Sequence, residues 1–340
     1  MNRRTFGRIL ATLAVSAALV APATAQTKMR ISLDTNPNHV RNQHVDMFVE
    51  RLKERVGDAL DIEVYPSAQL FRDRDVARAL RQGAVEMAIP GTWVLDGIEP
   101  SLALTSLPMF YGQDEEVTRR LIDGDVGKAI AEKTEERLRV HIPGPWLDLG
   151  FQSFFTVSDP IETTADIEGM KVRIPGGSAN AKRIEGLGGI PNAIAWPDVP
   201  LALSSKTVDA VTSSHESIKS AQLWDSGLSY AYDDRQYFAQ YVPMIASSFW
   251  DGLDEETRTA ITEVWAEVAA EERKAAAEAQ TEAMRINEEH GITIVTPSAE
   301  ELAAAREKLM PLQAGLVEEM GIDPELVETA QNALRDAGAL

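Results

Sequence analysis

Short stretches in which apolar and polar residues alternate recur along the sequence. In residues 169–177 (GMKVRIPGG), apolar residues alternate with Lys171 and Arg173, and a Pro-Gly-Gly run follows. This period of two predicts a strand with one buried face that ends at the proline. Similar patterns predict further strands over residues 28–34, 60–66 and 207–214, with a helix over residues 40–56 between the first two.

Predicted strands and helices alternate along the chain, which indicates an α/β fold with largely parallel sheets. In such sheets ligands bind beyond the carboxyl ends of the strands. Those ends fall at residues 34–39, 90–93, 173–177 and 212–215. Two α/β units that face each other across these ends would form a cleft, and we expect the ligand site there.

A long helix is predicted towards the C-terminus. Residues 254–290 contain neither Pro nor Gly, and Gly291 follows as a C-terminal cap. At about 1.5 Å per residue, such a helix would extend roughly 50 Å, which exceeds the width of one small domain. It must therefore either bridge both units or break.

The N-terminus has the organisation of an export signal. A basic segment with two arginines precedes a short apolar run at residues 9–20, and an Ala-Thr-Ala cleavage motif ends at Ala25. The apolar run is too short to span a membrane. We expect residues 1–25 to be a signal peptide and the mature chain to begin near Gln26 in the periplasm. The paired arginines also resemble a twin-arginine export signal, and both export routes stay open.

Composition narrows the classes of function. The 340 residues include 44% hydrophobic and 25% charged residues, which is ordinary for a globular protein. The formal net charge of −20 argues against nucleic acid as a partner, because the phosphates would be repelled. The absence of cysteine excludes disulfides, thiolate metal sites and cysteine nucleophiles.

One region carries a family motif. Residues 166–175 contain an Asp-x-x-Gly-x-Lys-x-Arg-x-Pro run, and a Leu-Gly-Gly segment, Trp196 before an acidic helix start and a Val-Asp-Ala strand follow it. The earlier blocks VYPSAQL, GAVEMAI and SLPMFYG agree in order and spacing. Over nearly its whole mature length, the chain resembles the substrate-binding subunits of tripartite ATP-independent periplasmic (TRAP) transporters, the DctP-like family.

The resemblance implies a two-lobe periplasmic binding protein fold, type II-like, with a long helix bridging the lobes. Lobe one is expected to comprise residues 26–149 and about 239–275, and lobe two residues 150–238 and about 276–340. The resemblance also implies that Arg173 holds the ligand carboxylate in a bidentate pair, a geometry that a lysine does not give. A solvated arginine at a strand edge is the alternative interpretation.

The sequence departs from the family pattern at positions that bear on the ligand. Many members carry a second arginine on a neighbouring strand, where this chain has Gln152. Ser213 stands where many members have a ligand-contacting asparagine, and Trp196 is the family's aromatic residue at the cleft. A neutral amide does not neutralise a second acid. We therefore expect a mono-acid rather than a dicarboxylate or a sialic-acid-like ligand, and a sulfonate stays open.

Three further residues are candidates on position alone. Trp93 lies at the predicted rim of lobe one and Trp146 precedes the crossover to lobe two, so each either lines the cleft or fills the core. His39 follows the first strand and is either a ligand contact or a solvated loop residue. A metal ion could use the spacing of His39, His44 and Asp46, but one of these side chains would lie in a loop and two on a helix, which argues against a metal site. We expect no metal and no cofactor.

The sequence predicts a binding protein rather than an enzyme. It contains no nucleophile elbow, phosphate-binding loop or other catalytic constellation. We expect a monomer that captures a small organic acid and delivers it to the integral-membrane permease subunits of a TRAP transporter, which an ion gradient drives. The alternatives are the binding protein of an ATP-driven importer, which the motif at residues 166–175 argues against, and a periplasmic α/β enzyme.

Overall fold

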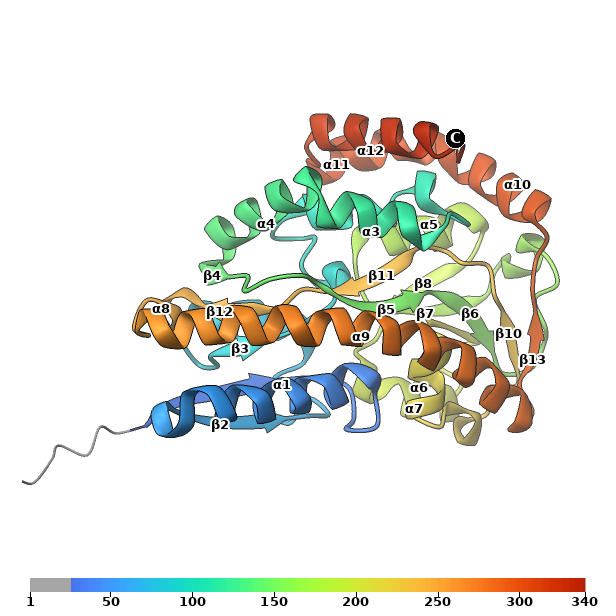
Figure 1. The fold of residues 1–340 in the computed structure, drawn as a ribbon. Helices are drawn as coiled ribbons and strands as arrows, with labels where there is room; N and C mark the ends of the chain where they lie inside the picture. The colour runs from blue at the N-terminus through green and yellow to red at the C-terminus, as the bar shows by residue number, and fades with distance from the viewer. Residues whose placement is uncertain (1–25, 340) are drawn as a thin grey trace, which may run out of the picture.

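The computed structural model describes residues 26–339, so the predicted signal peptide lies outside the described residues. Two sheets with helices around them form most of the structure, and one long helix runs along both (Figure 1). The strands are β1 (Thr27–Ser32), β2 (Leu60–Tyr65), β3 (Met87–Ala88), β4 (Val140–His141), β5 (Leu147–Phe151), β6 (Ser153–Thr156), β7 (Lys171–Ile174), β8 (Ile190–Ala193), β9 (Ala210–Ser213), β10 (Tyr230–Tyr232), β11 (Phe238–Tyr241), β12 (Met244–Ala246) and β13 (Thr293–Val295). The α-helices are α1 (Val40–Val56), α2 (Asp73–Arg81), α3 (Glu115–Asp123), α4 (Asp125–Leu138), α5 (Ser178–Leu187), α6 (Val199–Ser204), α7 (His215–Ser220), α8 (Ser247–Trp250), α9 (Glu255–Glu289), α10 (Ala299–Leu309), α11 (Gln313–Met320) and α12 (Pro324–Asp336).

The sheets define two lobes. Lobe one contains the five-stranded sheet β2-β1-β3-β12-β4, and lobe two contains the six-stranded sheet β13-β10-β6-β9-β7-β8. Within them β1 runs parallel to β2 and β3, and β7 runs parallel to β8 and β9. Strands β12 and β6 are antiparallel to their neighbours, and β5 pairs with β11 in a two-stranded sheet between the lobes. The predicted two-lobe α/β fold is confirmed.

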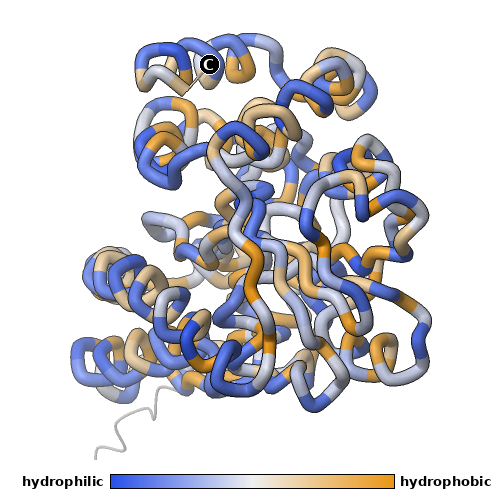
Figure 2. Tube along the Cα trace, turned by 90° about the vertical axis from the view of Figure 1, so that its right-hand side faces the viewer, coloured by the Kyte–Doolittle hydropathy of each residue, from blue (hydrophilic) through white to orange (hydrophobic). Residues whose placement is uncertain are grey.

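Each lobe has its own apolar core. The sheet of lobe one is packed against α1 and the first half of α9, with Met29, Ile31 and Phe48 fully buried among them. In lobe two, separate clusters cover the two faces of the six-stranded sheet. Figure 2 shows hydrophilic and hydrophobic positions on each of the peripheral helices, which is the pattern of helices with one face on a core.

Helix α9 bridges the lobes, as the sequence predicted. The Asp254 side chain caps its start by accepting the backbone N–H of Thr257 at 2.7 Å. Buried residues recur at helical spacing through its first half, where Trp265 is fully buried and meets Phe48 edge to face. The helix packs against α1 of lobe one, then β5, then α7 of lobe two.

The C-terminal helices do not all belong to lobe two. The predicted division gave residues 276–340 to that lobe, and α10 does pack against its helix α5. Helix α12 instead packs against α3 and α4 of lobe one, where Leu326 and Ala330 join the core. An ion pair from Lys133 on α4 to Asp323 fixes the start of α12. The end of the chain therefore returns to lobe one, and the other predicted lobe boundaries stay a prediction.

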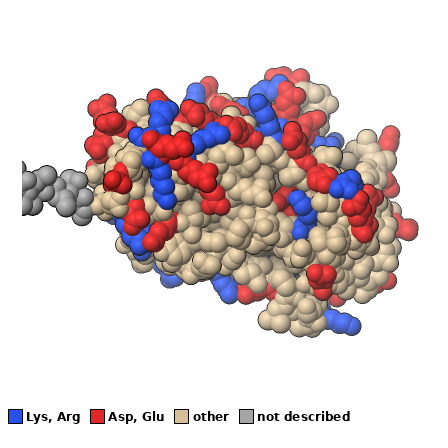
Figure 3. Space-filling model, turned by 60° about the horizontal axis from the view of Figure 1, so that its bottom comes forward, with Lys and Arg blue, Asp and Glu red and all other residues tan. Residues whose placement is uncertain are grey.

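Charges of both signs share the surface. On the face shown in Figure 3, acidic and basic side chains are interspersed, and no extended area is covered by basic side chains alone. Some of these charged side chains form ion pairs between helices: Arg51 and Arg55 of α1 pair with Glu271 and Glu263 of α9. Within residues 26–339, none of the helices combines the length and the apolar character that a bilayer crossing needs.

Candidate ligand-binding site

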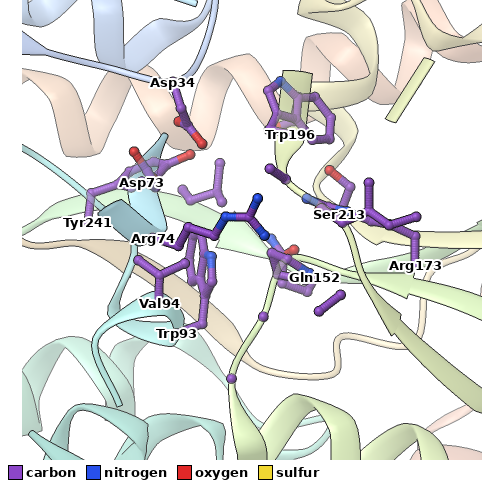
Figure 4. A pocket seen from close by; sticks show the side chains of 18 of the residues that line it. Asp34, Asp73, Arg74, Trp93, Val94, Gln152, Arg173, Trp196, Ser213 and Tyr241 are labelled. Atoms are coloured by element: carbon purple, nitrogen blue, oxygen red, sulfur yellow. Dashed lines mark hydrogen bonds between the residues drawn. The ribbon is translucent and has the colours of Figure 1, made fainter. Parts of the chain in front are cut away.

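A cavity of about 230 Å³ lies between the two lobes at the carboxyl ends of their strands. Five of the seven residues that the sequence singled out line it, namely Arg173, Gln152, Ser213, Trp196 and Trp93. Figure 4 shows them together with side chains from lobe one that the sequence analysis missed. The volume suits a small molecule rather than a peptide.

Arg173 is the central cation of the site. It is 3% exposed on β7, where its Nε donates to the carbonyl oxygen of Ile194 at 2.9 Å and its Nη1 to that of Thr212 at 3.1 Å. Among residues 26–339, no carboxylate forms an ion pair with it. A guanidinium has five N–H donors, so three stay available to a ligand.

Burial lowers the pKa of Arg173 to about 10, against the raising effect of Asp34 and two tyrosines. The lowered pKa means that the protein groups around Arg173 only partly stabilise its buried charge. An unpaired buried charge is unfavourable, and an anion in the cavity would relieve it. The Trp196 ring, 5.4 Å from the guanidinium carbon, covers one side of the group.

Gln152 and Ser213 supply neutral polar groups beside Arg173. Gln152 lies between β5 and β6, is 3% exposed, and has a buried Nε2 with no hydrogen-bond partner among the described residues. Ser213 ends β9, the strand between β6 and β7. The expectation that Gln152 and Arg173 lie on neighbouring strands is therefore wrong, because the strand of Ser213 separates them.

The wall of lobe one is acidic. Asp34 follows β1 and Asp73 begins α2, and both point into the cavity (Figure 4). The fully buried Arg41 lies behind them, with Nη2 2.6 Å from Asp34 Oδ1 and Nη1 3.7 Å from Asp73 Oδ2. Burial, and secondly the charge of Asp34, raise the pKa of Asp73 well above its usual value. This wall can accept hydrogen bonds from a ligand, and it repels a carboxylate when ionised.

Aromatic rings line the same side. Trp93 is 8% exposed and lies 5.6 Å from the ring of Tyr241, which in turn covers the Arg41 guanidinium at 4.0 Å. Gly91 permits the position of Trp93, since a Cβ atom there would be 2.2 Å from the indole ring. At Gly177 of lobe two, which has a φ of +88°, a Cβ atom would lie 2.9 Å from the Trp93 carbonyl oxygen. The Pro-Gly-Gly run after β7 therefore lets the lobes meet.

Hydrogen bonds and ion pairs join the lobes around the cavity. Arg72 makes two contacts with Asp198, at 2.6 and 3.0 Å. The Ser178 N–H at the start of α5 donates to Asp96 at 2.8 Å. The Asn36 amide donates to the carbonyl oxygen of Ser220 at 3.0 Å. The structure therefore shows the lobes in contact.

Two predicted site residues do not line the cavity. Trp146 is 4% exposed in the core of lobe one, so its interpretation as a cleft wall is wrong. His39 is fully buried and caps α1, and its Nε2 lies 2.8 Å from Glu216 and 3.2 Å from Ser217 of α7. It joins the lobes and reaches the cavity only through Ser217, which does line it.

The sequence analysis missed several lining residues. Asp34 stood at a predicted strand end, so its position on the rim was available from the pattern. Asp73 and Arg74 follow the VYPSAQL block at the start of a helix, and this position is a weaker indication of a binding site than a strand end. Nothing in the local sequence marks Tyr241. Within residues 26–339, no group of three or more His, Asp or Glu side chains is placed to hold a metal ion.

These features define a two-lobe α/β protein whose cavity between the lobes is lined by a buried arginine. The family model of the bacterial extracellular solute-binding proteins, family 7 (DctP), matches residues 31–319, and the chain belongs to this family. The C4-dicarboxylate-binding periplasmic protein DctP of Rhodobacter capsulatus is 28% identical over 334 residues, which are 95% of this chain and 96% of that protein.

Solved structures share the fold. The sugar acid binding protein of Advenella mimigardefordensis in complex with galactonate has a TM-score of 0.86 at 21% identity, covering 92% of this chain and 99% of that chain. The TRAP solute-binding protein of Roseobacter denitrificans with bound β-D-glucuronate has a TM-score of 0.83 at 24% identity, covering 89% and 99%. The proteins in these comparisons are solute-binding proteins.

Proposed function

We propose that this protein captures a small monocarboxylic acid in the periplasm and delivers it to an ion-gradient-driven TRAP permease. The observation that carries the proposal is Arg173, a buried guanidinium with free donors and no carboxylate partner among the described residues. The ligand carboxylate would take those donors, with Gln152 and Ser213 beside it and Trp93 and Trp196 enclosing the remainder. The site would carry out no chemical step.

The walls favour one carboxylate and a hydroxylated tail. The position of a second strand cation is held by neutral Gln152, and Asp34 and Asp73 oppose a second carboxylate on the other side. Their oxygens suit hydroxyl donors. Sugar acids such as the galactonate and glucuronate bound by the two structural relatives have this chemistry, whereas C4-dicarboxylates do not.

A thermal-shift screen of sugar acids, hydroxy acids, sulfonates and succinate tests the ligand class. Ligand at 100 times its Kd stabilises the folded protein by about 2.7 kcal/mol, which raises the melting temperature by several degrees. The expected result is a shift with a hydroxylated mono-acid and little or none with succinate. If succinate gives the largest shift, the argument from Gln152 fails; if no acid shifts the protein, the proposed function fails.

Arg173→Lys tests the anchor. Lysine keeps a charge but loses the planar fork, and breaking a desolvated charged contact weakens binding by roughly 2–5 kcal/mol. We expect calorimetry to show Kd rising roughly 30-fold to several thousand-fold, with the melting temperature of the free protein preserved. The matched control, Arg285→Lys, changes an exposed arginine on α9 and should leave Kd unchanged. Binding within threefold of wild type would remove Arg173 as the anchor.

Delivery is tested by reconstituting this protein in vesicles with the membrane subunits of a TRAP permease. Uptake should require this protein and an ion gradient, and it should proceed without ATP. Uptake that needs ATP would favour the ATP-driven importer, and turnover of the bound acid by the isolated protein would favour the enzyme alternative.

A further inference from the structure

A second arginine reaches the cavity from the opposite lobe. Arg74 lies in the first turn of α2, and Figure 4 shows its guanidinium in the middle of the cavity, directed towards Gln152. Its neighbours are paired, since Arg72 contacts Asp198 and Arg78 lies 3.8 Å from Asp75. Arg74 itself makes no hydrogen bond or ion pair with any of residues 26–339. An exposed arginine is usually just solvated, but this one is exposed to a ligand cavity.

Three sets of donors converge there without acceptors. They are the free N–H groups of Arg173, the unpartnered Nε2 of Gln152 and the guanidinium of Arg74. The oxygens of Asp34 and Asp73 do not meet this need, because they lie beside Arg41 on the far wall. A carboxylate offers about four lone-pair positions, enough for donors from two sides.

We propose that Arg74 is a second contact for the ligand carboxylate, delivered by lobe one only when the lobes come together. The inference rests on the proposed function, in which Arg173 anchors that carboxylate. Arg173 is fixed by lobe two whether or not the lobes meet, because both of its backbone acceptors belong to lobe two. Arg74 moves with α2, whose preceding residue Arg72 forms the ion pair to Asp198 of lobe two.

Because the two arginines belong to different lobes, we expect them to affect different rate constants of binding. The encounter of ligand with the open protein depends on Arg173, whereas the lifetime of the closed complex depends on both arginines. Removing Arg74 should therefore accelerate dissociation and leave association nearly unchanged.

The test compares Arg74→Gln with Arg78→Gln, one turn further along the same helix and outside the cavity. The probes are D-galactonate and succinate, with Trp fluorescence as the stopped-flow signal because Trp93 and Trp196 line the cavity. For D-galactonate, Arg74→Gln should raise Kd roughly tenfold to hundredfold, the range for a hydrogen bond to a charged group. The dissociation rate should carry that change, with the association rate within threefold of wild type.

Arg78→Gln should bind like wild type, and both variants should melt at the wild-type temperature without ligand. The proposal is overturned if Arg74→Gln binds D-galactonate within threefold of Arg78→Gln, or if the loss lies in the association rate. It is also overturned if only succinate binding weakens, since Arg74 would then serve a second anion. Loss of binding in Arg173→Lys with none in Arg74→Gln would refute this inference alone, whereas a wild-type protein that binds no acid would refute the proposed function.

Discussion

Replacing Asp96 with Asn tests whether closure of the lobes buries an ionised carboxylate and thereby weakens ligand binding at neutral pH. Asp96 follows the Trp93 turn of lobe one, and its Oδ2 accepts the N–H of Ser178 in lobe two at 2.8 Å. Burial raises the pKa of the Asp96 carboxyl to about 6, against the lowering effect of hydrogen bonds from the Ser178 and Gly97 N–H groups. Closing the lobes over an ionised Asp96 is therefore unfavourable, and a proton relieves it.

The pKa values give the sign and size of the effect. With the lobes apart, the carboxyl is taken to have its ordinary pKa of 3.8, so the closed protein binds the proton more tightly. Closure should be favoured as pH falls below about 6 and should lose this contribution as pH rises through that value. Between about pH 7.5 and about pH 5 this contribution changes the affinity about tenfold.

Calorimetric titration with D-galactonate at several pH values in that range is the assay, because a sugar-acid carboxylate stays ionised throughout it. Wild type should bind about tenfold more tightly at the acid end. Asp96→Asn should show a flatter profile and tighter binding than wild type near pH 7.5, since its amide oxygen still accepts the Ser178 N–H. Asp58→Asn, an exposed substitution outside the cavity, serves as control.

Asp73 shares the cavity, and its raised pKa gives a dependence of the same sign, so the informative quantity is the difference between the two profiles. If Asp96→Asn keeps the full wild-type dependence, closure does not desolvate Asp96 and the reasoning is refuted. Wild-type affinity that falls towards acid pH would refute the sign itself.

Two other substitutions test folding and the shape of the site. Burial raises the pKa of Asp234 to about 8, against the lowering effect of the hydrogen bond that Tyr111 donates to it. Because the folded protein then holds a proton that the unfolded chain releases, this group should lower the free energy of unfolding by roughly 1.4 kcal/mol per pH unit between about pH 4 and 8. Urea unfolding at pH 5 and 7 should show that Asp234→Asn removes this decline, and parallel profiles for both proteins would contradict it. Gly91→Ala should displace Trp93, changing Trp fluorescence and weakening ligand binding, whereas Gly315→Ala, with open space around it, should change neither; an unchanged spectrum and Kd for Gly91→Ala would show that the indole is not held there.

Much of this fold follows from local patterns in the sequence. The alternation around Arg173 gives β7 with its buried face, and the long run without Pro or Gly gives α9. Each of these predictions needs only the period of apolar residues and the residues that stop or cap an element. The family motif then marked Arg173, and the strand-end rule placed it with Asp34 on one rim.

The rest depended on contacts between distant parts of the chain. A tryptophan pattern does not distinguish core from cleft, and the packing of the other elements of lobe one buries Trp146 while Gly91 and Tyr241 hold Trp93 at the cavity. Likewise Arg74 resembles any charged residue on the exposed face of a helix, and only the placement of the second lobe puts it in the cavity. Sequence periodicity specifies which face of an element is apolar. Which element covers that face is decided by the association of residues far apart in the chain, and here that association assembles the two cations, the amide and the acidic wall into one site.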